Sequence, residues 1–271
     1  MYFDVKGKRV FATTGGKPFD NSKPVVIFLA GSGGDHTFWG LHARFFAFRK
    51  YSVLCPDAPG HTHSAGPALD SIEALADWLN EVVTALDIKD LSIVAHSQGC
   101  LVALEYASRF PHKLRSMSLI TSGLATPVND YLLKAANDNP AAAVDMMISW
   151  GFGPAGHLHQ GPIPGNSMAR VGYTTMWRNS PQALAADLHA CNDYRNGRAA
   201  AAAVQCPVQV IIAGKDRMAP AKATATLVEH LPDPVVARIS ESGHMLPLEV
   251  PDQCRAALRD FIFAHNPAGR V

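Results

Sequence analysis

The stretch around Ser97 limits the fold of this chain more than any other. An apolar run leads into Ala95-His96-Ser97-Gln98-Gly99, and a second apolar run follows directly. This order predicts a strand, a one-residue bend at Ser97 and a helix. Such a bend needs small residues two positions before and two positions after its centre, because the strand and the helix pass within van der Waals contact there. Ala95 and Gly99 meet that need.

A bend of this kind gives its serine a chemical role. A serine hydroxyl is a poor nucleophile unless it stands clear of its own backbone and beside a base. A sharp turn presents Ser97 in that way, and the unpaired amides that begin the following helix point toward any negative charge that develops nearby. The pentapeptide by itself also suits an ordinary buried turn in which Ser97 only caps the helix. The rest of the chain has to decide between the two interpretations.

Composition favours one α/β domain with room for an insertion. The chain has 271 residues, of which 48% are hydrophobic, and this is enough for a sizeable core. Lys and Arg number 24 against 23 Asp and Glu, so the charge balance gives no footprint for nucleic acid or an anionic membrane. The longest apolar runs are far too short to span a bilayer. We therefore expect a small-molecule substrate, no nucleic-acid or membrane partner, and leave a homodimer open.

The cysteines and the first residues bear on location and cofactors. Five cysteines are spread along the chain without a Cys-x-x-Cys pair, which is typical of buried thiols in a reducing compartment and not of disulfides or a metal site. The segment Met1–Lys6 has an acid and no apolar stretch of the kind that a secretory signal needs. A cytoplasmic location follows, with no metal and no cofactor.

Strand-like and helix-like patterns alternate over most of the chain. The predicted strands are Tyr2–Val5, Lys8–Thr13, Val25–Ala30, Ser52–Cys55, Leu91–Ala95, Leu114–Thr121, Val208–Ala213 and Val235–Ile239. The predicted helices are His42–Arg49, Ile72–Leu86, Gln98–Arg109, Ala221–His230 and Pro251–Ala264. Continuous apolar strands separated by helices predict an α/β fold with a mostly parallel eight-stranded sheet and helices on both faces.

The alternation stops near Gly123 and resumes near residue 196. Between them, a stretch from Gly151 to Gly165 is too rich in Pro and Gly for regular elements. We predict a helical cap over residues 125–195, inserted after the sixth strand into a core of residues 1–124 and 196–271. Its apolar side chains indicate an apolar pocket, although such residues more often serve packing; they are Met146, Met147, Trp150, Phe152, Met168, Met176 and Trp177.

Two further residues supply what Ser97 needs for catalysis. An imidazole must take the serine proton, and an acid must fix the imidazole's tautomer. His244 follows the last predicted strand, and Asp216 follows the strand before it. Either residue alone could serve a loop or a helix cap. Loops after parallel strands emerge on one side of the sheet, where ligands bind, and the order Ser, Asp, His is the one that goes with this bend. We predict a triad of Ser97, His244 and Asp216.

An oxyanion site and a substrate pocket complete the prediction. The glycine-rich segment after the strand at Val25 lets backbone amides approach a ligand, so we assign the oxyanion donors to the amides of Ser32 and Gln98. The segment lacks the Gly-x-Gly-x-x-Gly and Gly-Lys-Ser/Thr patterns, which makes phosphate binding a weak competitor. The residues expected to contact the substrate are Gly31, His36, Trp150, Met218 and Met245.

Taken together, these segments resemble the α/β-hydrolase superfamily over nearly the whole chain. The matching pieces are Leu29-Ala30-Gly31 with Trp39 downstream, Asp57 to Ser64, the bend at Ser97, Gly214-Lys215-Asp216 and Gly243-His244. Two positions depart from the pattern: family members commonly have His where this chain has Ala30, and Gly where it has Ala95. The missing His leaves open how the oxyanion loop is braced.

The resemblance implies a capped serine hydrolase of the kind that acts on esters, lactones or the carbon-carbon bonds of ring-cleavage products. We expect it to cleave a small to medium, largely apolar ester, lactone or related carbonyl substrate through an acyl-enzyme. Three alternatives stay open. A cofactor-free dioxygenase of the same fold is similar at His96-Ser97 but has a second His where this chain has Gln98. A perhydrolase or acyltransferase would share the triad, and a hydrolase-fold ligand receptor would keep the triad with little turnover. A serine at the bend, where dehalogenases and epoxide hydrolases have Asp, speaks against those two chemistries.

Overall fold

The computed structural model describes residues 1–157, 165 and 167–266. Its strands are β1 (Tyr2–Val5), β2 (Lys8–Thr13), β3 (Val25–Leu29), β4 (Ser52–Pro56), β5 (Leu91–His96), β6 (Leu114–Ile120), β7 (Val208–Ala213) and β8 (Val235–Ile239). They form one sheet in the order β1-β2-β4-β3-β5-β6-β7-β8. The pairs β1–β2 and β2–β4 are antiparallel, and the other pairs are parallel. The predicted eight-stranded, mostly parallel sheet is confirmed.

Helices cover both faces of this sheet. On one face lie α2 (Ile72–Ala85), α3 (Gln98–Arg109), α9 (Gly197–Ala202) and α10 (Ala221–His230), and on the other lie α1 (Gly40–Ala47) and α12 (Pro251–His265). Shorter helical segments are η1 (His36–Trp39), η2 (Pro111–Lys113) and α11 (Leu246–Glu249). Each predicted helix lies within two residues of its expected ends, because its apolar periodicity and its neighbouring loops agree.

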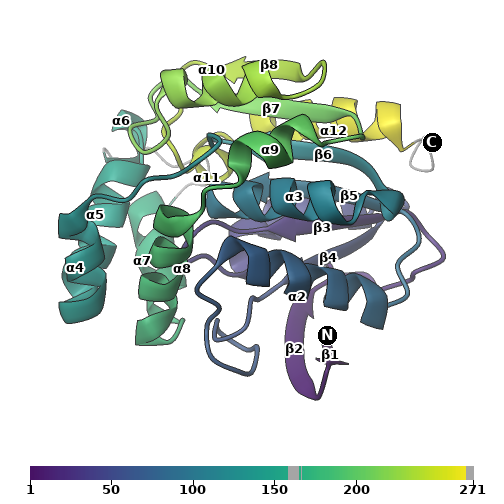
Figure 1. The fold of residues 1–271 in the computed structure, drawn as a ribbon, viewed down its shortest axis with the longest axis horizontal. Coiled ribbons are helices and arrows are strands. Elements are labelled where there is room, and N and C mark those ends of the chain that lie inside the picture. The colour runs from purple at the N-terminus through teal and green to yellow at the C-terminus, as the bar shows by residue number, and fades with distance from the viewer. Residues whose placement is uncertain (158–164, 166, 267–271) are drawn as a thin grey trace.

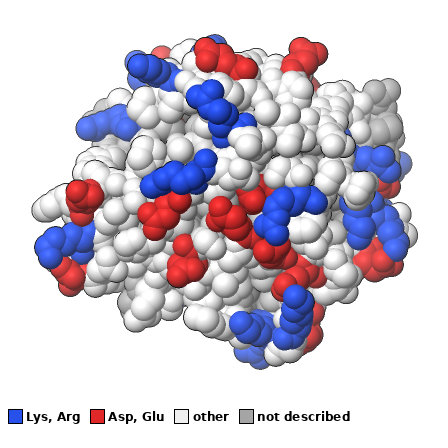
Figure 2. Space-filling model, viewed as in Figure 1, with Lys and Arg blue, Asp and Glu red and all other residues white. Residues whose placement is uncertain are grey.

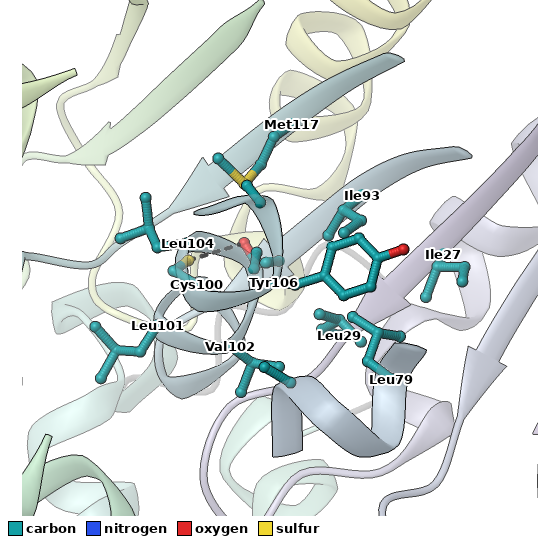
Figure 3. Packing of buried hydrophobic residues seen from close by; sticks show 14 of the residues in the cluster. Ile27, Leu29, Leu79, Ile93, Cys100, Leu101, Val102, Leu104, Tyr106 and Met117 are labelled. Atoms are coloured by element: carbon teal, nitrogen blue, oxygen red, sulfur yellow. Dashed lines mark hydrogen bonds between the residues drawn. The ribbon is translucent and has the colours of Figure 1, made fainter. Parts of the chain in front are cut away.

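Strand β3 shows why the inner strands are apolar without interruption. Successive side chains of a strand point to opposite faces. Val25, Ile27 and Leu29 accordingly join the hydrophobic cluster under α2 and α3. Val26 and Phe28 join the cluster on the opposite face. Figure 3 shows Ile27 and Leu29 with Ile93 of β5, packed against side chains of α3 and against Leu79. Both faces are buried, so the centre of the sheet is a rigid platform for the residues at its ends.

Within the described residues, five helices precede α9 in the segment between β6 and β7: α4 (Asp130–Asp138), α5 (Pro140–Gly151), α6 (Pro154–His157), α7 (Met168–Trp177) and α8 (Pro181–Asp193). We call these the helical insertion. Figure 1 shows α4, α5, α7 and α8 gathered at one end of the sheet, beyond the carboxyl ends of the central strands. The helical insertion lies in the stretch for which the sequence predicts a cap. The domain boundaries of that cap stay a prediction.

The expectation that no regular element lies between Gly151 and Gly165 is wrong at α6, although residues 158–164 lie outside the described part. Proline disrupts a helix interior but fits the first helical position, where its missing N–H has no partner to lose. Pro154 stands at the start of α6, and Pro140 and Pro181 begin α5 and α8 in the same way. Proline here marks helix starts.

Candidate active site

Ser97 stands at the bend between β5 and α3 in a conformation that its neighbours enforce. Its backbone has φ 52° and ψ −119°, an unfavourable region for a residue with a Cβ atom, and such strain persists only where the surroundings hold it. The Ser97 amide donates to the carbonyl of Ile120 on β6 at 3.1 Å. A Cβ atom at Gly99 would lie 2.8 Å from the carbonyl oxygens of Leu29 and Ala30. The small residue expected after the serine is therefore required.

Ser97, His244 and Asp216 lie in one hydrogen-bonded chain. The Oγ of Ser97 is 2.9 Å from Nε2 of His244, and Nδ1 of His244 is 2.9 Å from Oδ2 of Asp216. Because a carboxylate accepts, Nδ1 carries the proton and Nε2 is left to accept the proton of the serine. The other oxygen of Asp216 accepts from the amides of Met218 and Ala219, each at 2.8 Å. The side chains of His244 and Asp216 are almost fully buried.

The side chains of His96 and Thr121 fix the backbone of His244. Its carbonyl oxygen accepts from Nε2 of His96 at 2.9 Å and from Oγ1 of Thr121 at 3.2 Å. Burial, with the nearby His244, lowers the pKa of His96 to about 3. His96 therefore stays neutral and supports the His244 loop as a hydrogen-bond donor. In the sequence, the position of His96 next to Ser97 was the feature that could have indicated this role.

Glu249 braces the same loop from α11. Its Oε2 accepts from the amide of Gly243 at 3.1 Å and from the amide of Gly153 at 3.0 Å. Burial raises the pKa of this carboxyl. The residue joins the His244 loop to the helical insertion, and no motif in the sequence marks it.

The two amides assigned to the oxyanion site are free to donate to a ligand. Neither the Ser32 nor the Gln98 amide has a hydrogen-bond acceptor within the described residues. Gln98 begins α3, where helix geometry leaves amides unpaired. Ser32 and Ser97 both line each of the two cavities that open at the serine.

The larger cavity, of about 390 Å³, lies under the helical insertion. Besides Ser97 and His244, its lining includes Trp150 and Met218, both expected from the sequence, and Arg217, which is exposed. Arg217 is the one Lys, Arg, Asp or Glu side chain among its described lining residues. A cavity of this size, whose wall combines apolar and polar side chains, suits a small to medium ligand.

A second cavity, of about 30 Å³, also opens at the serine, and its lining includes two of the three remaining expected contacts, Gly31 and Met245. His36 lines neither cavity. Its Nδ1 is 2.9 Å from Oδ1 of Asp57, and its ring contacts Phe11 and His63. The sequence could predict that the loop after β3 lies at the site, but it could not predict that the His36 side chain points away from the cavities.

The apolar residues expected to shape the pocket divide between lining and packing. Met147 lines both cavities and Met176 lines the smaller one. Phe152 and Met168 are buried in the hydrophobic cluster on the face of the sheet that α1 and α12 cover. Trp177 lies on the surface, 54% exposed. Met146 is partly buried against the same cluster.

In the part of the chain that the structure describes, the surface charge and the arrangement of possible metal ligands do not indicate a second site. Figure 2 shows acidic and basic side chains interspersed over one face of the molecule. Within the described residues, no helix is long and apolar enough to cross a bilayer. No group of three His, Cys, Asp or Glu in that part of the chain is arranged to hold a metal ion.

Comparison with known proteins adds a family match. Residues 26–257 match the model of the "Alpha/beta hydrolase family". Among curated relatives, the pimeloyl-[acyl-carrier protein] methyl ester esterase of Aromatoleum aromaticum is 27% identical over 261 residues, which cover 89% of this chain and 99% of that protein. An uncharacterized protein of Mycobacterium bovis is 31% identical over 118 residues, 43% of this chain. The match spans about a third of that mycobacterial protein (34%).

Solved structures with the same fold cover nearly the full chain. The enol-lactonase of Burkholderia xenovorans superposes with a TM-score of 0.86 at 19% identity, over 97% of this chain and 99% of that one. The esterase of Exiguobacterium antarcticum gives 0.83 at 15% identity, over 95% and 97%. At these identities the likeness shows the fold alone.

Proposed function

Because the chain belongs to the α/β-hydrolase family, we propose that it is a serine hydrolase that cleaves a small to medium, largely apolar ester or lactone through an acyl-enzyme on Ser97. One observation carries the proposal: the unbroken chain from Asp216 through His244 to Ser97 ends at a cavity of about 390 Å³. The esterases and the lactonase among its relatives and fold neighbours support this substrate class.

In the first half of the reaction, Nε2 of His244 takes the proton of Ser97 as Oγ attacks the substrate carbonyl carbon. The carbonyl oxygen becomes an oxyanion, which the amides of Ser32 and Gln98 stabilise by donation. The intermediate then collapses, the bond to the leaving alkoxide breaks, and His244 returns the proton to it. The acyl group stays on Ser97 as an ester.

In the second half, water enters the cavity and His244 takes one of its protons as the oxygen attacks the acyl carbon. Collapse releases the carboxylic acid and gives the proton back to Ser97. Asp216 keeps the imidazole in the tautomer that the hydrogen bonds define, and stabilises its charged form in both halves. No other group has to change its protonation.

The first test is Ser97→Ala, assayed with nitrophenyl esters of increasing chain length and with simple lactones. We expect kcat to fall on the order of 10³- to 10⁶-fold. Ser108→Ala is the matched control, because Ser108 lies at the far end of the same helix and donates to the carbonyl of Glu105. Labelling of the wild type by a fluorophosphonate, with the adduct mapped to Ser97, identifies the nucleophile directly.

The panel also separates the alternative functions. Full ester cleavage by Ser97→Ala contradicts the proposal. Slow or single turnover by the wild type favours a receptor, and oxygen consumption with 3-hydroxy-4-oxoquinolines in place of ester cleavage favours a dioxygenase. Added alcohol or peroxide that diverts the acyl group from water favours acyl transfer or perhydrolysis.

A further inference from the structure

Asp187, on α8 of the helical insertion, is a buried carboxylate outside the predicted triad. Its Oδ2 accepts from the Gly33 amide at 2.7 Å and from Nε2 of His61 at 3.0 Å. Its Oδ1 and its backbone carbonyl both accept from the side-chain Nε2 of Gln98, at 3.3 Å and 3.1 Å. One acidic residue therefore contacts the segments that carry both proposed oxyanion amides, Ser32–Gly33 and Gln98.

The partner His61 is charged in this setting. Its Nδ1 donates to the carbonyl oxygen of Pro59 at 3.1 Å, and its Nε2 donates to Asp187, so both ring nitrogens carry protons. Burial opposes that charge. The carboxylate of Asp187, the two hydrogen bonds and the nearby Asp57 outweigh the burial and raise the pKa of His61 to about 9. Asp187 and His61 thus form an ion pair whose side chains are each 3% exposed.

The Gly33 peptide groups are held from both sides by the insertion. The amide of Gly33 donates to Asp187, and its carbonyl oxygen accepts from Nδ2 of Asn179 at 2.8 Å. Gly33 has φ +67°, a conformation that costs glycine little. The Ser32 amide lies one peptide earlier. The place of that amide therefore depends on contacts that the core alone does not provide.

We propose that Asp187 and His61 are a positioning pair that fixes the distance between the two oxyanion amides. The inference rests on the serine-hydrolase function proposed above. Position 30, where family members commonly carry a His, holds Ala30 in this chain, and a methyl group cannot donate to the loop. In this chain the loop is braced from α8 of the insertion, through the contact between Asp187 and the Gly33 amide.

The charge on Asp187 is central to this role. A buried carboxylate that accepts from three donors holds each more firmly than a neutral acceptor does. Removal of the charge also leaves His61 without its ion-pair partner in a buried place, which weakens the arrangement further. Because negative charge develops on the substrate oxygen on the way to the tetrahedral intermediate and is absent from the bound substrate, a displaced amide affects kcat more than substrate binding.

Asp187→Asn tests the pair in the full chain. Loss of one well-placed oxyanion donor costs about 10²- to 10³-fold in kcat, and a displaced donor costs less, so we expect kcat to fall about 10- to 100-fold with KM within about threefold. The affinity for a trifluoromethyl ketone should fall in parallel, because its adduct with Ser97 places an oxyanion between the two amides. Asp193→Asn, at the exposed end of the same helix, should keep kcat within about twofold.

A second variant covers the case in which Asp187→Asn does not fold. His61→Gln keeps a donor for Asp187 and removes the charge, so kcat and the ketone affinity should both fall, by less than in Asp187→Asn. A purely structural role would lower the melting temperature and leave the kcat and the ketone affinity of the folded protein unchanged. That result in either folded variant overturns the positioning pair. If Ser97→Ala is inactive at the same time, the hydrolase proposal still stands.

Discussion

Gly99, two residues after the serine, offers a quantitative test of how tightly the bend is packed. A Cβ atom there would lie 2.8 Å from the carbonyl oxygens of Leu29 and Ala30 and 2.9 Å from the Cβ of Leu29. Ordinary van der Waals contact begins near 3.4 Å. Two of the three obstacles are backbone atoms, which cannot rotate away. Gly99→Ala must therefore move α3 from the end of β3 by about 0.6 Å, the shortfall between 2.8 and 3.4 Å.

Two effects set the stability change. Overpacking of this size costs about 1–3 kcal/mol, while Ala in a helix gains at most about 1 kcal/mol over Gly. With the full helix gain subtracted, the net loss is about 0–2 kcal/mol, which corresponds to a fall of at most about 8 °C in melting temperature for a chain of this length.

The kinetic effect follows from the same displacement. The shift separates the Gln98 amide on α3 from the Ser32 amide after β3. A misplacement of about 1 Å costs about 100-fold, so we expect kcat to fall about 10- to 30-fold for Gly99→Ala.

The assay is ester hydrolysis with a thermal melt of each variant, and Gly40→Ala is the matched control. Gly40 begins α1 in a right-handed helical conformation, and a Cβ atom there would meet no heavy atom within 4 Å. That variant should melt slightly higher, by the equivalent of about 0.5–1 kcal/mol, with unchanged kcat. If Gly99→Ala also melts as high as the wild type and keeps kcat within twofold, the close packing at the bend does not control catalysis.

Two further predictions concern buried titratable groups. Burial, with Arg255 nearby, lowers the pKa of His42 to about 3. Between pH 3 and 6.5 the unfolded chain therefore binds a proton at His42 that the folded chain does not. The free energy of unfolding falls as the pH falls through this range, by up to about 1.4 kcal/mol per pH unit. His42→Leu should flatten this dependence in urea titrations at pH 4–6.5, and an unchanged slope contradicts the assignment. Of the five free cysteines, four are buried and Cys206 is half-buried. A thiol reagent at pH 8 should therefore modify at most one thiol in the native protein and all five in guanidinium. Rapid labelling of several thiols in the native protein would show that the core opens.

The strands, and the approach of Ser97, Asp216 and His244 to one another, could be predicted because each depends on local pattern and chain order. Val208–Ala213 and Val235–Ile239 lie where their apolar runs indicated, and parallel strands bring the loops that follow them to one edge. Those two facts suffice to bring Asp216 and His244 toward Ser97. The hydrogen bonds add the distances, which no sequence pattern contains.

Contacts across the insertion could not be predicted in the same way. Asp187 and His61 are 126 positions apart, and nothing in the helical pattern of α8 says which side chain meets the core. Their pairing depends on how the inserted helices seat on the sheet. Such packing follows from the summed fit of many apolar side chains, which single-residue chemistry does not indicate.

The place of β8 in the sheet has a consequence for how the molecule loses function. Among the strands that the structure describes, β8 is an edge strand and pairs with β7 alone, and Val235 and Val236 are 50% and 37% exposed. Peripheral elements with few buried contacts open before the interior does. His244 lies in the loop after β8, so mild heating or denaturant should separate the proposed base, His244, from the proposed nucleophile, Ser97, while the central strands stay intact. Inactivation would then precede the loss of helical signal, and the enzyme would recover quickly on return to gentle conditions.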